Sequence, residues 1–388
     1  MMWLSDVKLI QADRIIENGA LRIENGVIAE ITESAGQPSG FTVFPGFIDM
    51  HGDMIELELE PRPKVDFPME VAAQHLDARL AGAGVTTAYA GVSFSRSAKD
   101  GERRSFEHTS AIIRALKDNI QGLRVDHRIH ARFDMTYTDA IAALESLLVA
   151  GAVDLVSVMD HTPGQGQYRN IEKLISYRMR GGASEAEARA RLRAQIENAV
   201  PAEEMLRNLE DVSRLCKAHG IAMASHDDDT VRKAYLMADI GAVISEFPVT
   251  IEAAQVAKER GLMIAMGAPN AMRGQSYSGN LSAREAHAAG LLHILAADYH
   301  PAAILPAIRA LSASDPDGLV GAARLASKNP AKALGLTDRG EIAIGKRADL
   351  AVVDAADRVV KTFGAGQVIF SNGSGPKTAE QSAVAAVA

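Results

Sequence analysis

Short apolar segments alternate with helical patterns along most of the chain. From residue 44 onward an apolar stretch of strand length is followed by a helical stretch, and this order repeats. The expected strands are residues 43–50, 86–92, 128–135, 154–159, 221–225, 242–247, 262–266 and 294–297. Strands and helices that alternate in this way favour a parallel sheet, and eight such units favour a closed barrel over an open doubly wound sheet.

The two ends of the chain have a different pattern. Residues 7–31 are typical of short strands, with turn signals at Glu17-Asn18-Gly19 and Glu24-Asn25-Gly26. The chain rejoins this part from about residue 336, and the tail after residue 374, which lacks aromatic side chains, is expected to be loosely ordered. We therefore predict an α/β protein with a (β/α)8 TIM-like barrel at residues 44–335 and a small discontinuous β-sandwich domain at residues 1–43 and 336–388.

Length and charge agree with this architecture and limit the partners. The chain has 388 residues, of which 47% are hydrophobic, enough for a barrel of about 250 residues plus a smaller module. The formal net charge of -8 argues against general nucleic-acid binding. An anionic ligand would therefore need local positive charge or a metal ion.

Cysteine usage and hydropathy bear on the compartment. Cys216 is the only cysteine, which excludes an internal disulfide and a cysteine-based metal cluster. It lies in a helix expected at residues 205–219, where a buried structural thiol is predicted. Because the sequence has no secretory signal and no run of eighteen apolar residues, we expect a soluble, cytoplasmic protein without a membrane segment.

Polar side chains recur where the expected strands end. His51 and Asp53 follow the first strand two residues apart, so that they point the same way. The other polar residues at strand ends are His130, Asp134, Asp160, His161, His226, Asp227, Glu246, Asn270 and Asp298. Taken singly, a histidine is more often a satisfied polar residue, and a strand-end acid often caps the next helix. Because the carboxyl ends of barrel strands meet at one rim, metal coordination accounts better for the whole set.

Two segments far apart in the chain carry a family resemblance. Residues 44–53, FPGFIDMHGD, and residues 340–354, GEIAIGKRADLAVVD, resemble the amidohydrolase superfamily. The resemblance implies a metal-dependent hydrolase whose first barrel strand ends in metal ligands. This chain has Asp53 in place of the second histidine of that superfamily, and Glu246 near the position of its sixth-strand histidine. Carboxylates shift the preference toward Mn2+ or Mg2+ without excluding Zn2+, so we expect one or two divalent ions, with zinc the expected ion in a purified sample.

Six strings in the same order point to one branch of the superfamily. They are residues 51–56, 60–63, 159–165, 225–228, 246–248 and 267–280. These strings resemble the family of α-D-ribose 1-methylphosphonate 5-triphosphate diphosphatases, which act in the carbon-phosphorus lyase pathway of phosphonate catabolism. The resemblance implies hydrolysis of the 5-triphosphate of that sugar to a 5-phosphate, with release of diphosphate. Lys64, Asp134, Gln275 and Tyr277 depart from the usual residues of the branch and bear on the substrate.

Roles for the selected residues follow from this chemistry. Phosphoanhydride hydrolysis needs an in-line nucleophile and neutralisation of the departing diphosphate, and a divalent ion can serve both needs. The expected ligands are His51, Asp53, His226 and Asp298, with Asp134 or Glu246 bridging a second ion and Asp160, His161 and Asp227 as further ligands or neighbours. Asp298 is the expected general base, as the resemblance implies. The residues expected to donate hydrogen bonds to the substrate are Arg62, Arg169, Asn270, Arg273, Ser276, Ser278 and Asn280.

Two other functions stay open at this point. The barrel could act on a cyclic amide or an N-acyl small molecule, the commoner chemistry of the superfamily, but a neutral amide would not need Arg273. It could also be a non-catalytic binding subunit of a phosphonate-pathway complex, which retention of the whole ligand set argues against. For the favoured function the partner is a small phosphorylated sugar, and the oligomeric state stays open, a homo-oligomer included.

Overall fold

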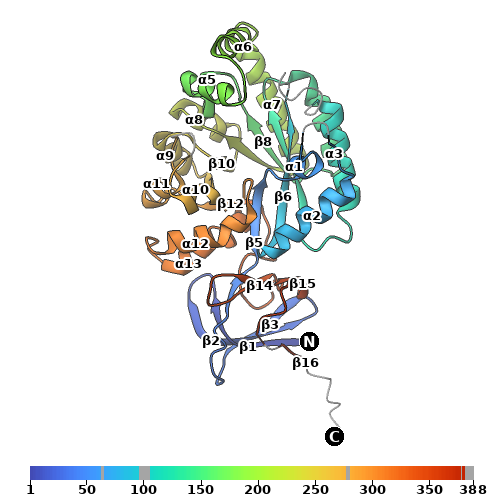
Figure 1. Cartoon of the computed structure of the whole chain (residues 1–388), viewed down its shortest axis with the longest axis vertical. Coiled ribbons are helices and arrows are strands. Elements are labelled where there is room, and N and C mark those ends of the chain that lie inside the picture. The colour runs from blue at the N-terminus through green and yellow to red at the C-terminus, as the bar shows by residue number, and fades with distance from the viewer. Residues whose placement is uncertain (63–64, 96–104, 277–279, 377, 381–388) are drawn as a thin grey trace. The chain divides into compact units, whose positions relative to one another are not determined.

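Two eight-stranded sheets organise the chain, which divides into two compact units (Figure 1). The computed structural model describes all residues except 63–64, 96–104, 277–279, 377 and 381–388, and it leaves the side chains of residues 167 and 378–380 undescribed. The first unit comprises Met1–Ala88, Asn119–His127 and Ile294–Ala388. The second unit comprises Tyr89–Asp118 and Arg128–His293.

The first sheet collects strands from both ends of the chain, all within the first unit. Its order is β15-β14-β13-β4-β1-β2-β3, and β16 pairs with β1. The strands are β1 (Met2–Ile10), β2 (Ile15–Glu24), β3 (Val27–Glu33), β4 (Thr42–Pro45), β13 (Leu350–Val353), β14 (Val359–Gly364), β15 (Gln367–Ser371) and β16 (Thr378–Glu380). Leu4 and Leu21 pack in one buried cluster with Val352 and Phe363. Segments from the two ends of the chain therefore share a core.

Of the two turns predicted in this sheet, one is confirmed and the other is wrong. Asn25 and Gly26 have φ angles of 51° and 81° and form the turn between β2 and β3. Glu17-Asn18-Gly19 instead lies inside β2. A Cβ on Gly19 would come within 2.7 Å of Leu9 Cδ1, so this glycine serves the close approach of β1 and β2. In the tail that was expected to be loosely ordered, β16 pairs with β1.

The second sheet contains the strands of the expected barrel, and its order follows the chain from β5 to β12. The strands are β5 (Phe47–Gly52), β6 (Val85–Phe94), β7 (Asp126–Asp134), β8 (Leu155–Met159), β9 (Ala222–His226), β10 (Ile244–Glu246), β11 (Met263–Gly267) and β12 (Ile294–Ala296). The pairs from β7 to β11 are all parallel. Within the first unit, Gly52 of β5 forms a parallel bridge with Asp298, just after β12, so the first and last strands of the order are neighbours. The predicted α/β barrel class is thereby confirmed.

The strand predicted at residues 43–50 is two strands, and this part of the prediction was wrong. β4 pairs with β1 and β13 in the first sheet, whereas β5 belongs to the barrel. Gly46 separates them, and a Cβ there would overlap the Thr86 side chain. One apolar run serves two sheets, and hydrophobicity alone carries no sign of the switch. His51 therefore lies inside β5 rather than after it.

Helices follow most of the barrel strands. They are α1 (Ile55–Leu59), α2 (Met69–Gly82), α3 (Phe106–Asn119), α4 (Ile141–Val149), α5 (Ile171–Arg180), α6 (Glu185–Glu197), α7 (Ala202–His219), α8 (Val231–Asp239), α9 (Ile251–Glu259), α10 (Ala268–Arg273), α11 (Ala283–Ala288), α12 (Ile304–Ser312), α13 (Gly318–Arg324) and α14 (Lys328–Ala333). The helix predicted at residues 205–219 is α7, which begins at Ala202. Within the described ranges, no helix is both long and apolar enough to cross a membrane.

A helical hairpin, α5 and α6, extends the connection after β8 in the second unit (Figure 1). The two helices pack on each other through Leu174, Ile175, Ala188 and Leu192. The Arg178 guanidinium on α5 donates to the carbonyl oxygen of Ala188 at 3.2 Å. Arg178 therefore helps to hold the two helices of the hairpin together.

Candidate metal centre

Three of the predicted site residues meet at the end of β5 in the first unit. His51 is buried, and its Nε2 lies 3.4 Å from Oδ1 of Asp53, whose side chain is 32% exposed. The Asp298 N–H donates to the His51 carbonyl oxygen at 2.9 Å, and the Asp53 N–H donates to the Asp298 carbonyl oxygen at 2.7 Å. One imidazole and two carboxylates are thus carried by two backbone segments, residues 51–53 and residue 298, that hydrogen-bond to each other.

Asp49, two residues before His51, contacts both of these segments within the first unit. Its Oδ1 accepts hydrogen bonds from the N–H of His51 at 3.1 Å and from the N–H of Ala297 at 2.8 Å. Burial raises the pKa of Asp49 to about 6, against the opposing effect of these two hydrogen bonds. Sequence reasoning did not select Asp49, although Asp49, His51 and Asp53 alternate along the strand, and that alternation was a usable signal.

His226 and Glu246 form a close pair in the second unit. They are register partners at the ends of β9 and β10, and His226 Nδ1 lies 2.9 Å from Glu246 Oε2. Glu246 is fully buried, and its Oε1 lies 3.7 Å from Nε2 of His130. His226 Nε2 lies 3.6 Å from Oδ2 of Asp227. Because Nδ1 faces the Glu246 carboxylate, Nε2 is the atom with which His226 can bind a metal ion.

Asp134 and His161 form a second pair in this unit. His161 Nδ1 lies 3.1 Å from Asp134 Oδ2, while Asp134 Oδ1 accepts from the N–H and the hydroxyl of Thr136. Asp160 Oδ1 accepts from the Thr162 N–H at 2.9 Å, as a turn residue does. The structure therefore brings Asp134 and His161 together and gives Asp160 a local backbone partner.

Three barrel strands are followed by a residue with a left-handed backbone. Asp227, Phe247 and Asp298 follow β9, β10 and β12 with φ angles of 54°, 52° and 57°. Each of their N–H groups donates to a carbonyl oxygen of a neighbouring strand, at 2.9, 2.8 and 2.9 Å respectively. Positive φ is uncommon outside glycine and persists where the surrounding structure enforces it, often at functional sites. Asp227 and Asp298 were both selected from the sequence, and Phe247 directly follows the selected Glu246.

The donor chemistry of these groups suits a divalent ion. His51, His130, His226 and Glu246 are buried and polar, and all four lie on barrel strands. Buried imidazole and carboxylate groups at the ends of barrel strands are typical of metal ligands and of the residues that orient them. The residues present therefore fit the metal that the barrel architecture and sequence motifs imply.

The predicted substrate-binding residues are more scattered. Arg62 is exposed and pairs with Val65 in an isolated bridge of the first unit. In the second unit, Asn270 Oδ1 accepts from the Ala283 N–H at 3.0 Å and so braces the loop that it begins. Arg273 is exposed at the end of α10. Arg169 is exposed, and Ser276 and Asn280 are half-buried, whereas Ser278, together with Lys64 and Tyr277, lies outside the described residues.

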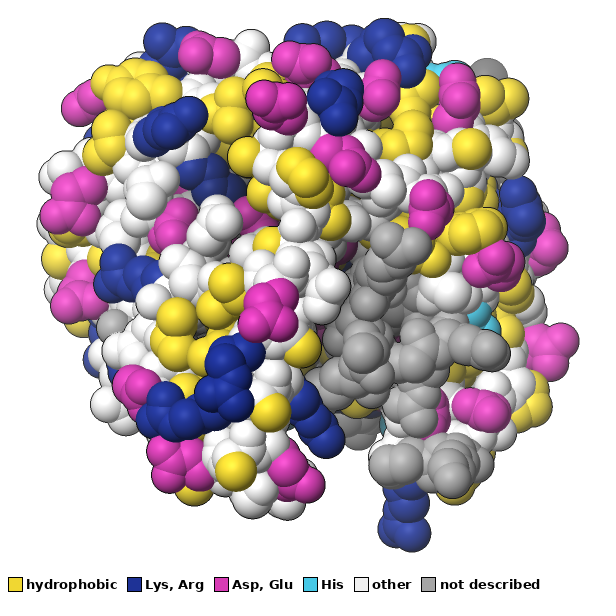
Figure 2. Space-filling model, turned by 90° about the horizontal axis from the view of Figure 1, so that it is seen from above, with side chains coloured by type: hydrophobic (Ala, Val, Ile, Leu, Met, Phe, Trp, Pro, Cys, Tyr) yellow, Lys and Arg dark blue, Asp and Glu magenta, His cyan; other side chains and the backbone are white. Residues whose placement is uncertain are grey.

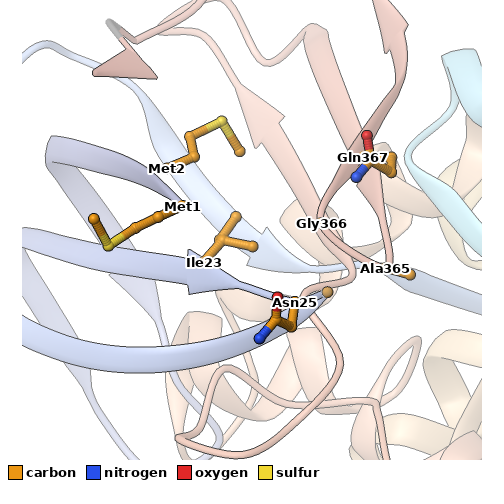
Figure 3. A pocket seen from close by; sticks show the side chains of 8 residues that line it. Met1, Met2, Ile23, Asn25, Ala365, Gly366 and Gln367 are labelled. Atoms are coloured by element: carbon orange, nitrogen blue, oxygen red, sulfur yellow. The ribbon is translucent and has the colours of Figure 1, made fainter. Parts of the chain in front are cut away.

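Surface charge and one surface hollow bear on where an anion could bind. On the face drawn in Figure 2, basic and acidic side chains are interspersed among the coloured residues. A hollow in the first unit is lined by residues of β1, β2, the β14–β15 turn and β15, among them Met2, Ile23 and Gln367 (Figure 3). None of its lining residues has a charged side chain.

Comparison with known proteins gives a relative and a family. Residues 42–374 match the model of the Amidohydrolase family. The alpha-D-ribose 1-methylphosphonate 5-triphosphate diphosphatase of Escherichia coli (strain K12) is 37% identical over 368 residues, which cover 92% of this chain and 96% of that protein. The resemblance stated from the motifs is therefore confirmed.

Solved structures of similar fold include two enzymes of low sequence identity. N-acetyl-D-glucosamine-6-phosphate deacetylase from Mycobacterium smegmatis has a TM-score of 0.64 at 15% identity, covering 95% of this chain and 100% of that chain. 5-Methylcytosine deaminase from Klebsiella pneumoniae has a TM-score of 0.65 at 16% identity, covering 95% of this chain and 97% of that chain. These two support the fold alone, whereas the match over residues 42–374 settles membership: the chain belongs to the amidohydrolase family.

Proposed function

We propose that this protein is a metal-dependent hydrolase that cleaves α-D-ribose 1-methylphosphonate 5-triphosphate to the 5-phosphate and diphosphate, as a step of phosphonate catabolism. The observation that carries the proposal is the 37% identity, over 92% of the chain, with the Escherichia coli diphosphatase of that name. The proposed partner is this small phosphorylated sugar, and the proposed compartment is the cytoplasm. Residues 44–335 are the proposed barrel domain, and residues 1–43 with 336–388 the proposed β-sandwich domain.

The proposed metal ligands are His51 and His226, and Glu246 is the residue proposed to orient His226. Each side chain is buried, and each belongs to the last two residues of its barrel strand. Two imidazoles suit Zn2+, while Asp53 and Asp298 add oxygens of the kind that Mn2+ and Mg2+ prefer. A divalent ion, when bound, supplies an activated water and offsets the charge on the departing diphosphate.

The protein's own groups supply proton transfer and orientation. Asp298 is the proposed general base, because its half-buried carboxylate is held at the strand end by backbone hydrogen bonds with His51 and Asp53. It takes the proton of the attacking water and returns it to a product oxygen. Glu246 faces His226 Nδ1 and so favours the tautomer in which Nε2 is free to bind the ion. The exposed Arg273 guanidinium suits paired hydrogen bonds with phosphate oxygens.

The test is 31P NMR of the zinc-loaded and manganese-loaded protein with α-D-ribose 1-methylphosphonate 5-triphosphate. ATP and a panel of cyclic amides and N-acyl compounds are assayed in parallel, with Asp298→Asn as the catalytic control. We expect diphosphate from the ribosyl substrate, lost in the variant. An inert triphosphate together with cleavage of an amide would overturn the proposal and leave the superfamily's commoner chemistry. A triphosphate that binds without turnover would leave the binding-subunit role.

A further inference from the structure

Lys233 on α8 is directed back toward the strand that carries His226. Its side chain is only 11% exposed. Its Nζ donates to the carbonyl oxygen of His226 at 2.9 Å and to that of Asp227 at 3.3 Å, and it lies 3.7 Å from Oδ1 of Asp228. An ammonium group has three N–H donors, and here three oxygens of consecutive residues surround it. All of these groups belong to the second unit.

Asp228 explains why a cation is needed at this place. It is fully buried, and its Oδ2 accepts from the hydroxyls of Ser225 and Ser245. Its Oδ1 accepts no hydrogen bond among the described residues. A buried carboxylate of this kind requires a charge partner, and the Lys233 ammonium is the group beside it.

The two carbonyl contacts carry a further consequence. The carbonyl oxygens of His226 and Asp227 belong to the two peptide units that flank the left-handed residue Asp227, whose φ is 54°. A hydrogen bond to both carbonyls fixes how this turn leaves β9, and with it the direction of the His226 side chain. The Asp227 N–H, bound to the Glu246 carbonyl oxygen at 2.9 Å, holds the same turn from the other side.

We propose that Lys233 is a positioning residue for the metal centre, which sets the backbone around Asp227 so that His226 presents Nε2 to the ion. The inference rests on the proposed function in one respect, namely that His226 is a metal ligand. A competing role for Lys233 is charge compensation of Asp228 alone. The two roles differ because only the first depends on the carbonyl contacts.

The experiment measures metal affinity in place of turnover. The full chain is stripped of metal, and Zn2+ binding is measured by equilibrium dialysis, with the visible spectrum of bound Co2+ as a report of ligand geometry. The variants are Lys233→Met, Lys233→Arg, the double variant Lys233→Met with Asp228→Asn, and His226→Asn. Arg232→Met is the matched control, since Arg232 is an exposed cation on the same helix. Thermal unfolding of each metal-free protein separates folding from binding.

We expect Lys233→Met to weaken Zn2+ binding about 10–100-fold, as loss of a residue that orients a ligand does, and to change the Co2+ spectrum. Lys233→Arg should recover only part of the affinity, because a planar guanidinium cannot direct its donors at the same three oxygens. Arg232→Met should bind like the wild type. The double variant has no buried carboxylate charge left to compensate, so it should fold. Its Zn2+ affinity should nevertheless stay as low as that of Lys233→Met.

Each contrary result has a separate meaning. Recovery of wild-type affinity and spectrum in the double variant would overturn the positioning role and leave charge compensation. Wild-type affinity in Lys233→Met, with binding lost in His226→Asn, would also overturn it. Wild-type affinity in His226→Asn would instead remove His226 from the ligand set and contradict the proposed metal centre itself.

Discussion

The N–H of Asp298 donates to the carbonyl oxygen of His51 at 2.9 Å, which joins the end of the last barrel strand to the first. The Asp53 N–H returns the contact to the Asp298 carbonyl oxygen at 2.7 Å. These bonds use only the backbone and do not involve the side chains of the three residues. The same two hydrogen bonds therefore close the barrel and place the proposed general base.

Asp298 lends itself to a variant pair that separates chemistry from backbone strain. Both Asp298→Asn and Asp298→Ala should lower kcat by about 100- to 10,000-fold, because the proposed general base is lost. At a φ of 57° asparagine is tolerated well and alanine is not, so Asp298→Ala should cost about 1–2 kcal/mol more stability than Asp298→Asn. Diphosphate release and thermal unfolding of the two variants check this. Equal stabilities would mean that the left-handed conformation is not enforced.

Gly46 should be coupled to Thr86 because the turn between β4 and β5 has no room for a Cβ. A Cβ at Gly46 would overlap the buried Thr86 side chain. We expect Gly46→Ala to lower the free energy of unfolding by about 1–3 kcal/mol, as overpacking does. Gly46→Ala combined with Thr86→Ala should lose less than the sum of the single changes. Urea unfolding of all four proteins measures the coupling, and additive losses would exclude the steric account.

The sequence predicts the regular part of the fold well because buried parallel strands leave compact apolar runs. The strand expected at residues 154–159 is β8, Leu155–Met159, and the one at residues 262–266 is β11, Met263–Gly267. The same signal fails at residues 43–50, where one apolar run crosses from one sheet to another at Gly46. It also fails at Gly19, where the glycine serves close packing within a strand and not a turn. In both places the deciding contact is with a residue of another strand, Thr86 for Gly46 and Leu9 for Gly19.

The candidate site could likewise be predicted from the sequence only in part. His226 and Glu246 end adjoining parallel strands, so their proximity could be predicted from strand order alone. Lys233 could not be selected in this way, because its partners are carbonyl oxygens, which every residue has. A lysine in an amphipathic helix is more often solvated. Its role depends on burial, which only the three-dimensional structure supplies.

Asp77 should give stability a dependence on acid pH. Burial pushes the pKa of Asp77 up, but hydrogen bonds from His127 and from the N–H groups of Val125 and Arg124 outweigh it and leave the pKa below its ordinary value. A lowered folded pKa means that this contribution is complete above the unfolded pKa of about 4 and is lost as pH falls through the folded value. Asp77→Ala should therefore cost about 3 kcal/mol at neutral pH, since several donors lose their acceptor.

The check on Asp77 is the urea midpoint of wild type and variant across acid pH. The gap between the two should stay constant above about pH 5 and shrink below about pH 4. A gap that persists unchanged at low pH would show that the ionised carboxylate is not what stabilises this corner of the first unit.

Cys216 should be unreactive in the native protein, in agreement with its predicted structural role. It is 2% exposed on α7, and burial raises the pKa of its thiol to about 12. Because the thiolate is the reactive species, almost none is present at about pH 8. An aromatic disulfide reagent should react with one thiol per chain in urea and with almost none in the native protein. Rapid native labelling would mean that α7 opens locally, which hydrogen exchange would then locate.

Variants of Arg273 test whether the substrate of the proposed metal-dependent barrel is a polyphosphate. It is exposed at the end of α10, and charge-assisted hydrogen bonds to phosphate are worth about 1.5–3 kcal/mol each, or about 10–100-fold in binding. Arg273→Ala should therefore lower kcat/KM for the triphosphate by about that factor, and Arg273→Lys should restore only part because it lacks the paired donor geometry. Zn2+ affinity should stay unchanged in both variants, with exposed Arg232→Ala as the control. If Arg273→Ala kept the wild-type KM for the triphosphate but bound a neutral amide better, the guanidinium would be a barrier to amides and not a phosphate ligand.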